Sequence, residues 1–318
     1  MAITAFGNRA TQARPLSPSF PGLVRAELYK MWAQWTTRIL LGLLLALTFS
    51  PYVLLLLLSD TKSRFLAAPM IQTFSIVEVA LTILRVFGGI TLLIITARAI
   101  GLEYQQGTIR VLLARGVGRV QLLTAKLVGV TLLALAIIIG SVILNTLLYL
   151  LQFGLIYGAG DQFSALTSNF WASSWAYFLT VLVSMSASIL LAACVAVVGR
   201  SLSFGLSVAL SWFAADNFAT LVLMFVYGLS GNDFWIKLPA YFLGPILNQL
   251  PSAYVPALTT SITTAAGKHF IERVDPGTVG LMPLVTYDAT HAFVVVLAYC
   301  LAFAAIAYVL TWRRDVLE

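Results

Sequence analysis

Ionisable and polar side chains interrupt two stretches of the sequence that are otherwise apolar. Glu78 and Arg85 lie seven positions apart in the first stretch, so on a helix they share one face over two turns. Asp216 and Asn217 lie near the middle of the second stretch. Carboxylates in an apolar setting suit acid–base chemistry, and opposite charges there suit either a buried ion pair or a polar path through the protein.

Arg85 and Asp216 are the expected partners in such an ion pair, because both fall near the middle of their apolar stretches. An unpaired charge at the centre of a membrane costs at least about 2.5–3.5 kcal/mol, and pairing relieves that cost. The same groups, with Asn217, would also suit a translocation path, and the sequence leaves both alternatives open. Glu78 falls nearer the end of its stretch, where water can solvate it.

Motifs for nucleotide, metal or nucleophilic chemistry are absent from the sequence. The fragment nearest to a phosphate-binding loop, residues 266–269, lacks the upstream glycine and the Ser or Thr that would bind magnesium. We find no H-E-x-x-H or G-x-S-x-G motif and no cluster with metal-ligand spacing. An intramembrane enzyme, such as a lipid-linked transferase, stays an alternative that would use Glu78, Asp216 or His291 for acid–base work.

The amino-acid composition indicates whether these side chains belong to a soluble protein or to a membrane protein. Of the 318 residues, 60% are hydrophobic and only 10% are charged, whereas soluble domains carry about 25% charged residues. A soluble enzyme, a disordered chain and an alternating transmembrane barrel are therefore excluded, and an all-α polytopic membrane protein is predicted. Cys194 and Cys300 lie within apolar runs and are expected to be core side chains rather than a disulfide.

Six apolar runs are long enough to span a membrane, which takes about 20 residues. They cover residues 39–58, 76–97, 122–157, 171–198, 202–229 and 289–312. With both termini cytoplasmic, the inner segments hold 13 Lys and Arg residues and the outer segments hold 5. This positive-inside bias predicts a multi-pass cell-membrane protein, and it explains the net charge of +7 without nucleic acid. The first run follows a long polar lead, so we expect an uncleaved anchor.

Three of the connections contain more than a turn. Residues 20–36 predict an N-terminal amphipathic helix whose apolar side includes Met31 and Trp35, while Arg25 and Lys30 reach the lipid headgroups. Residues 230–288 form a long external loop with a proline-interrupted apolar stretch at 238–255. This stretch is too broken to span, so we expect short re-entrant or interfacial helices.

Residues 98–126 form a third connection, with a distinct pattern of charges and glycines. Ile109, Leu112 and Leu113 predict the apolar face of a basic helix that follows a glycine turn and leads into the next span. An ordinary cytoplasmic loop would have a similar composition. The order is more specific: Glu103 is followed by Gly107, Thr108 and Arg110, then by a Leu-Leu pair, by Arg115 and Arg119, and by Lys126.

This order closely resembles the permease subunits of ABC-2 type transporters. The segment Arg25-Ala26-Glu27-Leu28-Tyr29-Lys30 resembles the amphipathic helix that precedes the first span in the same family. The resemblance covers essentially the whole chain, so residues 1–318 are expected to be one transmembrane domain. It implies that residues 98–126 are the coupling segment that touches an ATPase, with the contacts made by Glu103, Gly107, Thr108, Arg110, Arg115 and Arg119.

The resemblance also implies partners and a mechanism. Two permease chains, expected to be a homodimer, would each dock on a separately encoded cytoplasmic ABC ATPase subunit. ATP and magnesium would be bound by that partner, so the chain itself would need no cofactor and would not be an enzyme. Most relatives are exporters that work by alternating access. An ion-coupled carrier without ATP is the remaining alternative, and the inverted repeats that would support it are not visible.

Overall fold

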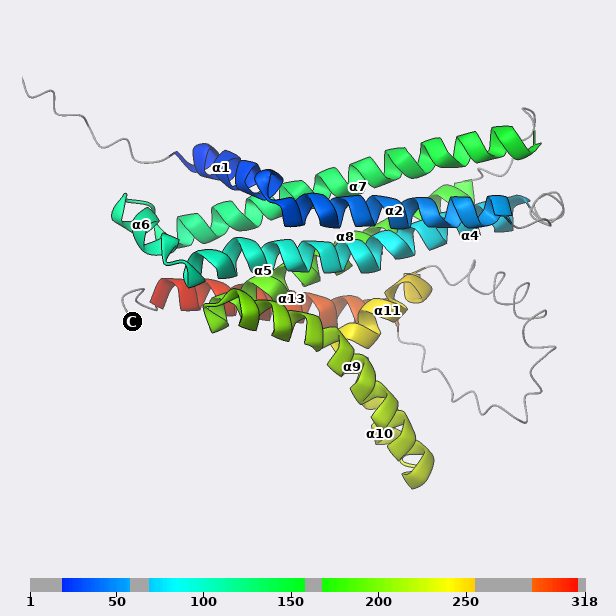
Figure 1. Ribbon diagram of the computed structural model, residues 1–318. Helices are drawn as coiled ribbons and strands as arrows, with labels where there is room; N and C mark the ends of the chain where they lie inside the picture. The colour runs from blue at the N-terminus through cyan, green and yellow to red at the C-terminus, as the bar shows by residue number, and fades with distance from the viewer. Residues whose placement is uncertain (1–18, 58–68, 158–167, 255–287, 314–318) are drawn as a thin grey trace, which may run out of the picture.

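The structure is a computed structural model that describes residues 19–57, 69–157, 168–254 and 288–313. Within these ranges the chain is almost entirely helical and forms no strand. Six of the helical segments are long and apolar enough to cross a membrane, and most of them run lengthwise in Figure 1. The predicted all-α architecture with six membrane-spanning segments is confirmed.

The six spans agree closely with the ranges predicted from hydrophobicity. They are α2 (Trp35–Leu57), α4 and α5 (Pro69–Ile83 and Gly89–Gln105, joined by the π-helical turn η1, Leu84–Gly88), α7 (Arg119–Tyr157), α8 (Ser168–Gly199), α9 (Leu202–Ser230) and α13 (Ala289–Arg313). The shorter elements are α1 (Phe20–Ala33), α6 (Thr108–Ala114), α10 (Asp233–Lys237), the 3-10 turn η2 (Leu238–Tyr241) and α11 (Leu243–Tyr254). The second span is longer than predicted, because its helix continues through polar residues to Gln105.

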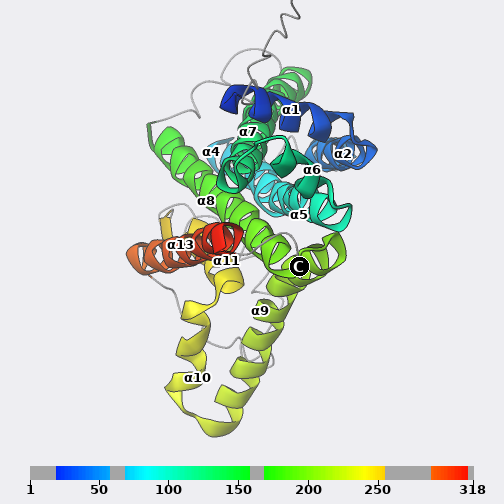
Figure 2. The same ribbon diagram turned by 90° about the vertical axis from the view of Figure 1, so that its left-hand side faces the viewer.

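Helix α8 forms the centre of the bundle, with α5 on one side of it and α13 on the other (Figure 2). Small residues at four-residue spacing run along α8, and each is at most 5% exposed: Ser184, Ser188, Ala192 and Ala196. Small side chains let helix backbones approach closely. A Cβ atom added to Gly205 of α9 would lie only 3.0 Å from the Ala196 Cα atom. These small residues form a packing seam, which α9 approaches closely at Ala196.

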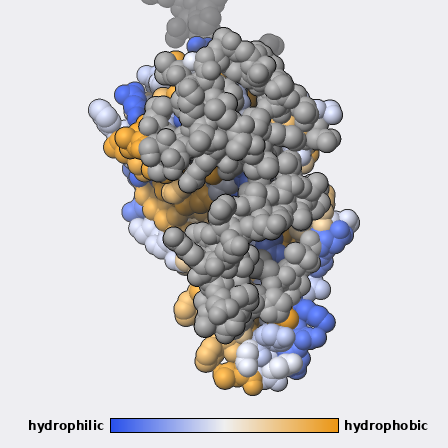
Figure 3. Space-filling view, turned by 90° about the vertical axis from the view of Figure 1, so that its right-hand side faces the viewer, coloured by the Kyte–Doolittle hydropathy of each residue, from blue (hydrophilic) through white to orange (hydrophobic). Residues whose placement is uncertain are grey.

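Helix α9 leaves the bundle, and α9 and α10 project away from it together in Figures 1 and 2. Only 6% of the apolar window of α9 is buried within the chain. Figure 3 shows apolar side chains on the surface at this lower end of the molecule. The exposed large apolar residues of α9 and α10 are Phe204, Leu210, Phe218, Leu221, Val222, Phe225, Leu229 and Phe234. Such a surface suits the apolar interior of a membrane.

Three short helices bring the chain back from the end of α9 to the bundle. The last of them, α11, packs against α8, α9 and α13 and buries Leu243, Ile246, Leu247 and Leu250. Short helices in the proline-interrupted stretch are therefore confirmed up to Tyr254. Residues 255–287 of the same loop lie outside the described ranges.

Helix α1 lies against α7 and α5 and buries Met31 as expected, but Trp35 does not belong to the buried face. The buried residues are Val24, Glu27 and Met31, which lie on one side of the helix. The prediction placed Trp35 on this face and was wrong, because Trp35 begins α2 and is 75% exposed. The helix thus covers the bundle through an acidic side chain as well as apolar ones.

Candidate functional site

Helix α6 is a seven-residue helix that two glycines separate from its neighbours. Gly107, between α5 and α6, has a φ of 68°, and Gly116, after α6, has a φ of 84°. Residues with a Cβ atom rarely adopt this left-handed conformation. The predicted glycine turn is therefore confirmed at Gly107, but the basic helix expected to lead from it into the next span is interrupted at Gly116. Thr108 begins α6, and its hydroxyl donates a hydrogen bond to the Glu103 carbonyl at 3.3 Å.

One face of α6 is fixed to the bundle by apolar contacts, and the other face is open. Ile109 is buried beside Val117 and Leu122, and Leu23 of α1 packs against the same cluster. Leu112 and Leu113 also pack there, so the predicted apolar face of α6 is confirmed. The exposed residues of α6 are Thr108, Arg110, Val111 and Ala114, and Arg115 and Gly116, which follow α6, are exposed as well.

Beneath α6, four charged side chains from three helices form a compact group, which we call the ionic cluster. Its members are Glu27 and Lys30 of α1, Glu103 of α5 and Lys126 of α7. Lys30 Nζ lies 2.7 Å from Glu27 Oε1 and 2.8 Å from Glu103 Oε1. Lys126 Nζ lies 3.0 Å from Glu27 Oε2 and 2.8 Å from Glu103 Oε1. Each lysine therefore bridges both glutamates, and α1, α5 and α7 are tied together.

Burial divides the ionic cluster into an inner and an outer part. The side chains of Lys126, Glu27 and Glu103 are 3%, 5% and 13% exposed, whereas that of Lys30 is 44% exposed. Lys126 also donates to the Ala99 carbonyl at 2.8 Å. Burial lowers the pKa of Lys30, but hydrogen bonds and negative charge from Glu103 and Glu27 outweigh this effect and raise its pKa above the usual lysine value. The ionic cluster has two basic and two acidic side chains, so its formal charges balance.

The structure corrects the role expected for Lys30 and adds Glu27 and Lys126 to the site. Lys30 was expected to reach the lipid headgroups, but it binds the two glutamates instead. The signal in the sequence was Glu27 three positions before Lys30, a spacing that joins side chains on a helix. Nothing in the sequence identified Glu103 and Lys126, from different helices, as their partners.

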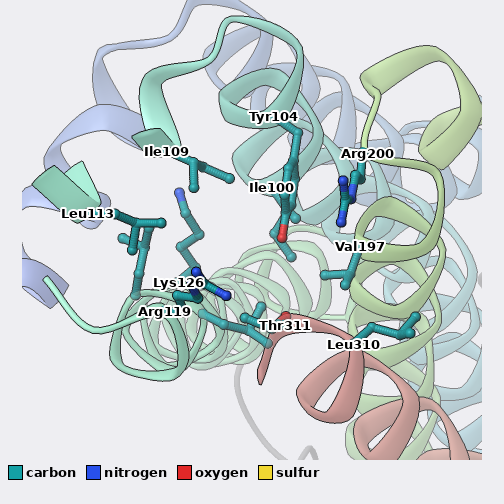
Figure 4. A pocket seen from close by; sticks show the side chains of 12 residues that line it. Ile100, Tyr104, Ile109, Leu113, Arg119, Lys126, Val197, Arg200, Leu310 and Thr311 are labelled. Atoms are coloured by element: carbon teal, nitrogen blue, oxygen red, sulfur yellow. The ribbon is translucent and has the colours of Figure 1, made fainter. Parts of the chain in front are cut away.

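Two openings lie beside the ionic cluster. A cavity of about 30 Å³ between α5, α6, α7, α8 and α13 has Arg119 and Lys126 on one side and Tyr104 and Arg200 on the other (Figure 4). It has room for about two water molecules and is too small for a substrate. A groove of about 440 Å³ between α1, α5 and α6 is larger. Its polar lining residues are Glu27, Lys30, Gln34, Arg98, Glu103, Gln106 and Thr108.

Arg85 and Asp216 do not form the ion pair predicted from the sequence. Arg85 Nη1 donates a hydrogen bond to the Leu247 carbonyl of α11. Asp216 Oδ2 accepts one from the Gly244 N–H of α11 at 3.0 Å. The pairing prediction was wrong because it counted only side chains as partners, and the backbone of α11 meets both charges.

The other two residues of the predicted intramembrane set are Asn217 and Glu78. Asn217 Oδ1 accepts a hydrogen bond from Asn248 Nδ2 of α11 at 3.3 Å. Glu78 lies partly buried in α4. His291 of α13 makes a 2.9 Å hydrogen bond between its Nε2 atom and the Ala240 carbonyl of η2. The structure thus places Asp216 and Asn217 together against α11 and gives Arg85, Asp216 and His291 backbone partners.

Comparison with known proteins assigns the chain to a family. A family model described as ABC-2 family transporter protein matches residues 26–316, which include every helix from α2 to α13. No curated protein sequence matches the chain. Members of this family are transmembrane transport components that are not themselves catalytic, and they normally work with an ATPase subunit. With six apolar spans in the part of the sequence that the structure describes, the chain is a multi-pass membrane protein that belongs to the ABC-2 family of transporter proteins.

Proposed function

We propose that the chain is the membrane-spanning permease subunit of an ATP-driven exporter and that a separate ATPase subunit binds it at α6. The two-sided construction of α6 carries this proposal. One face is fixed to α1 and α7 by apolar contacts, while Thr108, Arg110 and Val111 face outward. The ATPase would bind ATP and magnesium, so this chain supplies a docking surface and movement rather than hydrolysis.

The distribution of basic residues supports a cytoplasmic position for α6 and for both termini. The α6 region, the turn between α8 and α9 and the end of α13 lie at the same end of the molecule (Figure 1). These segments carry Arg110, Arg115, Arg119, Arg200 and Arg313. Helix α10, which carries Lys237, lies far from that end. Lys and Arg near span ends favour the cytoplasmic side of a cell membrane.

The ionic cluster gives a physical route from the ATPase to the spans. A force on α6 reaches α5 through the short turn at Gly107, and Glu103 lies in the last turn of α5. Because Lys126 and Lys30 tie Glu103 to Glu27, α1, α5 and α7 would move together. In a homodimer with two ATPase subunits, closure of the ATPases would move both permease chains and alternate the access of the path.

A matched pair of charge reversals tests the proposal. Arg110→Glu alters the exposed face of α6, and Lys237→Glu makes the same change in charge on exposed α10. The tagged full-length chain is purified in detergent from its native membrane, and bound proteins are identified by mass spectrometry and assayed for ATP hydrolysis. We expect an ATPase to accompany the unaltered chain and the Lys237→Glu variant, and to be lost with Arg110→Glu.

The possible results distinguish a wrong docking surface from a wrong function. Equal retention of the ATPase by both variants would show that α6 is not the docking surface. If no ATPase accompanies the unaltered chain, the exporter proposal itself fails.

A further inference from the structure

Helix α11 contains a proline that leaves one of its own carbonyl groups without a donor. Pro251 has no N–H, so it cannot donate the helical hydrogen bond to the Leu247 carbonyl four residues earlier. A buried carbonyl without a partner destabilises the folded state. Arg85 of η1, which is 8% exposed and 162 positions away in the sequence, supplies the donor. The buried guanidinium thus replaces a missing backbone N–H.

A second proline in the chain shows how the same problem is solved locally. Pro51 lies inside α2 and leaves the Leu47 carbonyl without its helical donor. The hydroxyl of the adjacent Ser50 donates to that carbonyl at 2.8 Å. In α11 the residue before Pro251 is Leu250, which has no donor in its side chain. The Leu247 carbonyl therefore depends on a residue from another helix.

Asp216 of α9 binds the N-terminal end of α11. Its Oδ2 atom accepts the Gly244 N–H in the first turn of the helix, where a negative charge also favours the helix dipole. A Cβ atom added to Gly244 would lie 3.1 Å from the Asp216 Cβ atom, so the two helices approach closely here. Two residues thus hold helix α11. Asp216 of α9 binds its N-terminal turn, and Arg85 of η1 binds the Leu247 carbonyl, three residues later.

We propose that Arg85 and Asp216 are positioning residues that hold α11 in place as a movable gate, which opens when Arg85 releases the Leu247 carbonyl. Both contacts are made to the backbone of α11, so they fix the position of the helix as a whole. Arg85 Nε is buried and has no acceptor among the described residues. Opening would let this N–H reach water, which offsets part of the lost contact. The gating role of α11 rests on the proposed function, whereas the contacts of Arg85 and Asp216 with α11 are independent of it.

The first experiment uses the permease alone in lipid nanodiscs and measures amide hydrogen exchange. Arg85→Met is expected to speed exchange in α11 by about tenfold or more, since α11 opens locally when a buried contact is lost. Arg85→Lys keeps a cationic donor at this position, so exchange in α11 is expected to stay slow in this variant. Pro251→Ala in the Arg85→Met background is expected to restore slow exchange, because the new residue supplies the missing N–H. Unchanged α11 exchange in Arg85→Met, or no restoration by Pro251→Ala, overturns the role of Arg85.

Matched controls are present in the same chain. Arg38 Nε donates to the Trp32 carbonyl at 3.0 Å, so Arg38→Met removes an arginine–backbone contact far from α11 and should leave α11 exchange unchanged. Pro51→Ala in the Arg85→Met background should restore nothing. Asp216→Asn keeps an acceptor oxygen and should hold α11, whereas Asp216→Leu should not. Equal α11 exchange in these two Asp216 variants overturns the role of Asp216.

The second experiment tests movement in the complex with the co-purified ATPase. Addition of a non-hydrolysable ATP analogue is expected to speed α11 exchange in the unaltered chain towards the Arg85→Met value, while α8 stays protected. Unchanged α11 exchange overturns the gate and leaves the exporter proposal intact. Absence of an ATPase overturns the exporter proposal, and the first experiment still decides the roles of Arg85 and Asp216.

Discussion

The two lysines of the ionic cluster provide a comparison in which the partners are the same and only burial differs. Lys30 and Lys126 each lie within 3.0 Å of both Glu27 and Glu103. The Lys30 side chain is 44% exposed and the Lys126 side chain is 3% exposed. We therefore predict that Lys126→Met lowers the stability of the fold far more than Lys30→Met does.

The expected magnitudes follow from the environments of the two cations. Removing one partner of a buried ion pair costs about 3–5 kcal/mol, because an uncompensated charge is left in the interior. A surface ion pair contributes about 0–1 kcal/mol, since water screens it. Lys126→Met leaves the buried Glu27 Oε2 atom without its cation, while Lys30→Met leaves both glutamates on Lys126. Lys30 alone then faces two carboxylates, so adding Glu27→Gln to Lys126→Met removes the excess negative charge and should recover part of the loss.

The measurement is the free energy of unfolding in mixed micelles, obtained from SDS titrations followed by circular dichroism. Methionine is close to lysine in size, so packing changes little in either variant. Equal losses for the two lysines would show that burial does not set the strength of these contacts. No recovery on addition of Glu27→Gln would refute the idea that an uncompensated charge causes the loss.

Three further predictions concern the same end of the molecule. Gly107→Ala forces a residue with a Cβ atom to a φ of 68° and should cost about 1–2 kcal/mol in SDS titrations. Gly101→Ala would place a Cβ atom 2.8 Å from the Leu202 Cα atom and should cost about 1–3 kcal/mol, whereas Gly140→Ala meets nothing within 4 Å and should not destabilise; similar values for Gly101→Ala and Gly140→Ala would refute this. Because folding raises the pKa of Lys30, its stabilising contribution should be fully present below about pH 10.4 and decline above it, and Lys30→Met should remove that part of the decline in a pH series.

The spans were predictable because the membrane imposes a simple rule on the sequence. A helix that crosses the apolar layer needs about 20 apolar residues, and each of the six predicted ranges overlaps a helix of the structure. The glycine turn at Gly107 was predictable for an equally local reason. The length of the second span was not, because α5 continues through Arg98 and Glu103, which an apolar pattern excludes.

The partners of the buried charges were not predictable from the sequence. A hydropathy pattern gives the depth of Arg85 and Asp216 but not the groups beside them. The sequence also gives no sign that the returning helix α11 inserts between these two residues and offers backbone partners. Glu27 was missed for a related reason, since its value as a site residue depends on Lys126 from another helix, 99 positions away.

One helical segment carries both a residue of the ionic cluster and a residue that holds α11. Glu103 and Arg85 lie 18 positions apart on η1 and α5, a distance of about 27 Å along a helix. Helix α11 has its own contacts with α9 and α13, so a shift of α5 along its axis would move Arg85 relative to the Leu247 carbonyl. We therefore predict that Lys126→Met, which loosens α5 at Glu103, speeds hydrogen exchange in α11, and that Lys30→Met does not.

The alternative is that the effect of Lys126→Met stays local. Exchange would then rise only in α1, the last turn of α5 and the first turn of α7, and the rate in α11 would equal that of the Lys30→Met variant. That result would refute transmission along α5, even if the ionic cluster and the α11 contacts both stabilise the fold. A rise in α11 that disappears when Pro251→Ala is added would instead tie the two ends together through Arg85, because the substituted helix no longer needs the arginine.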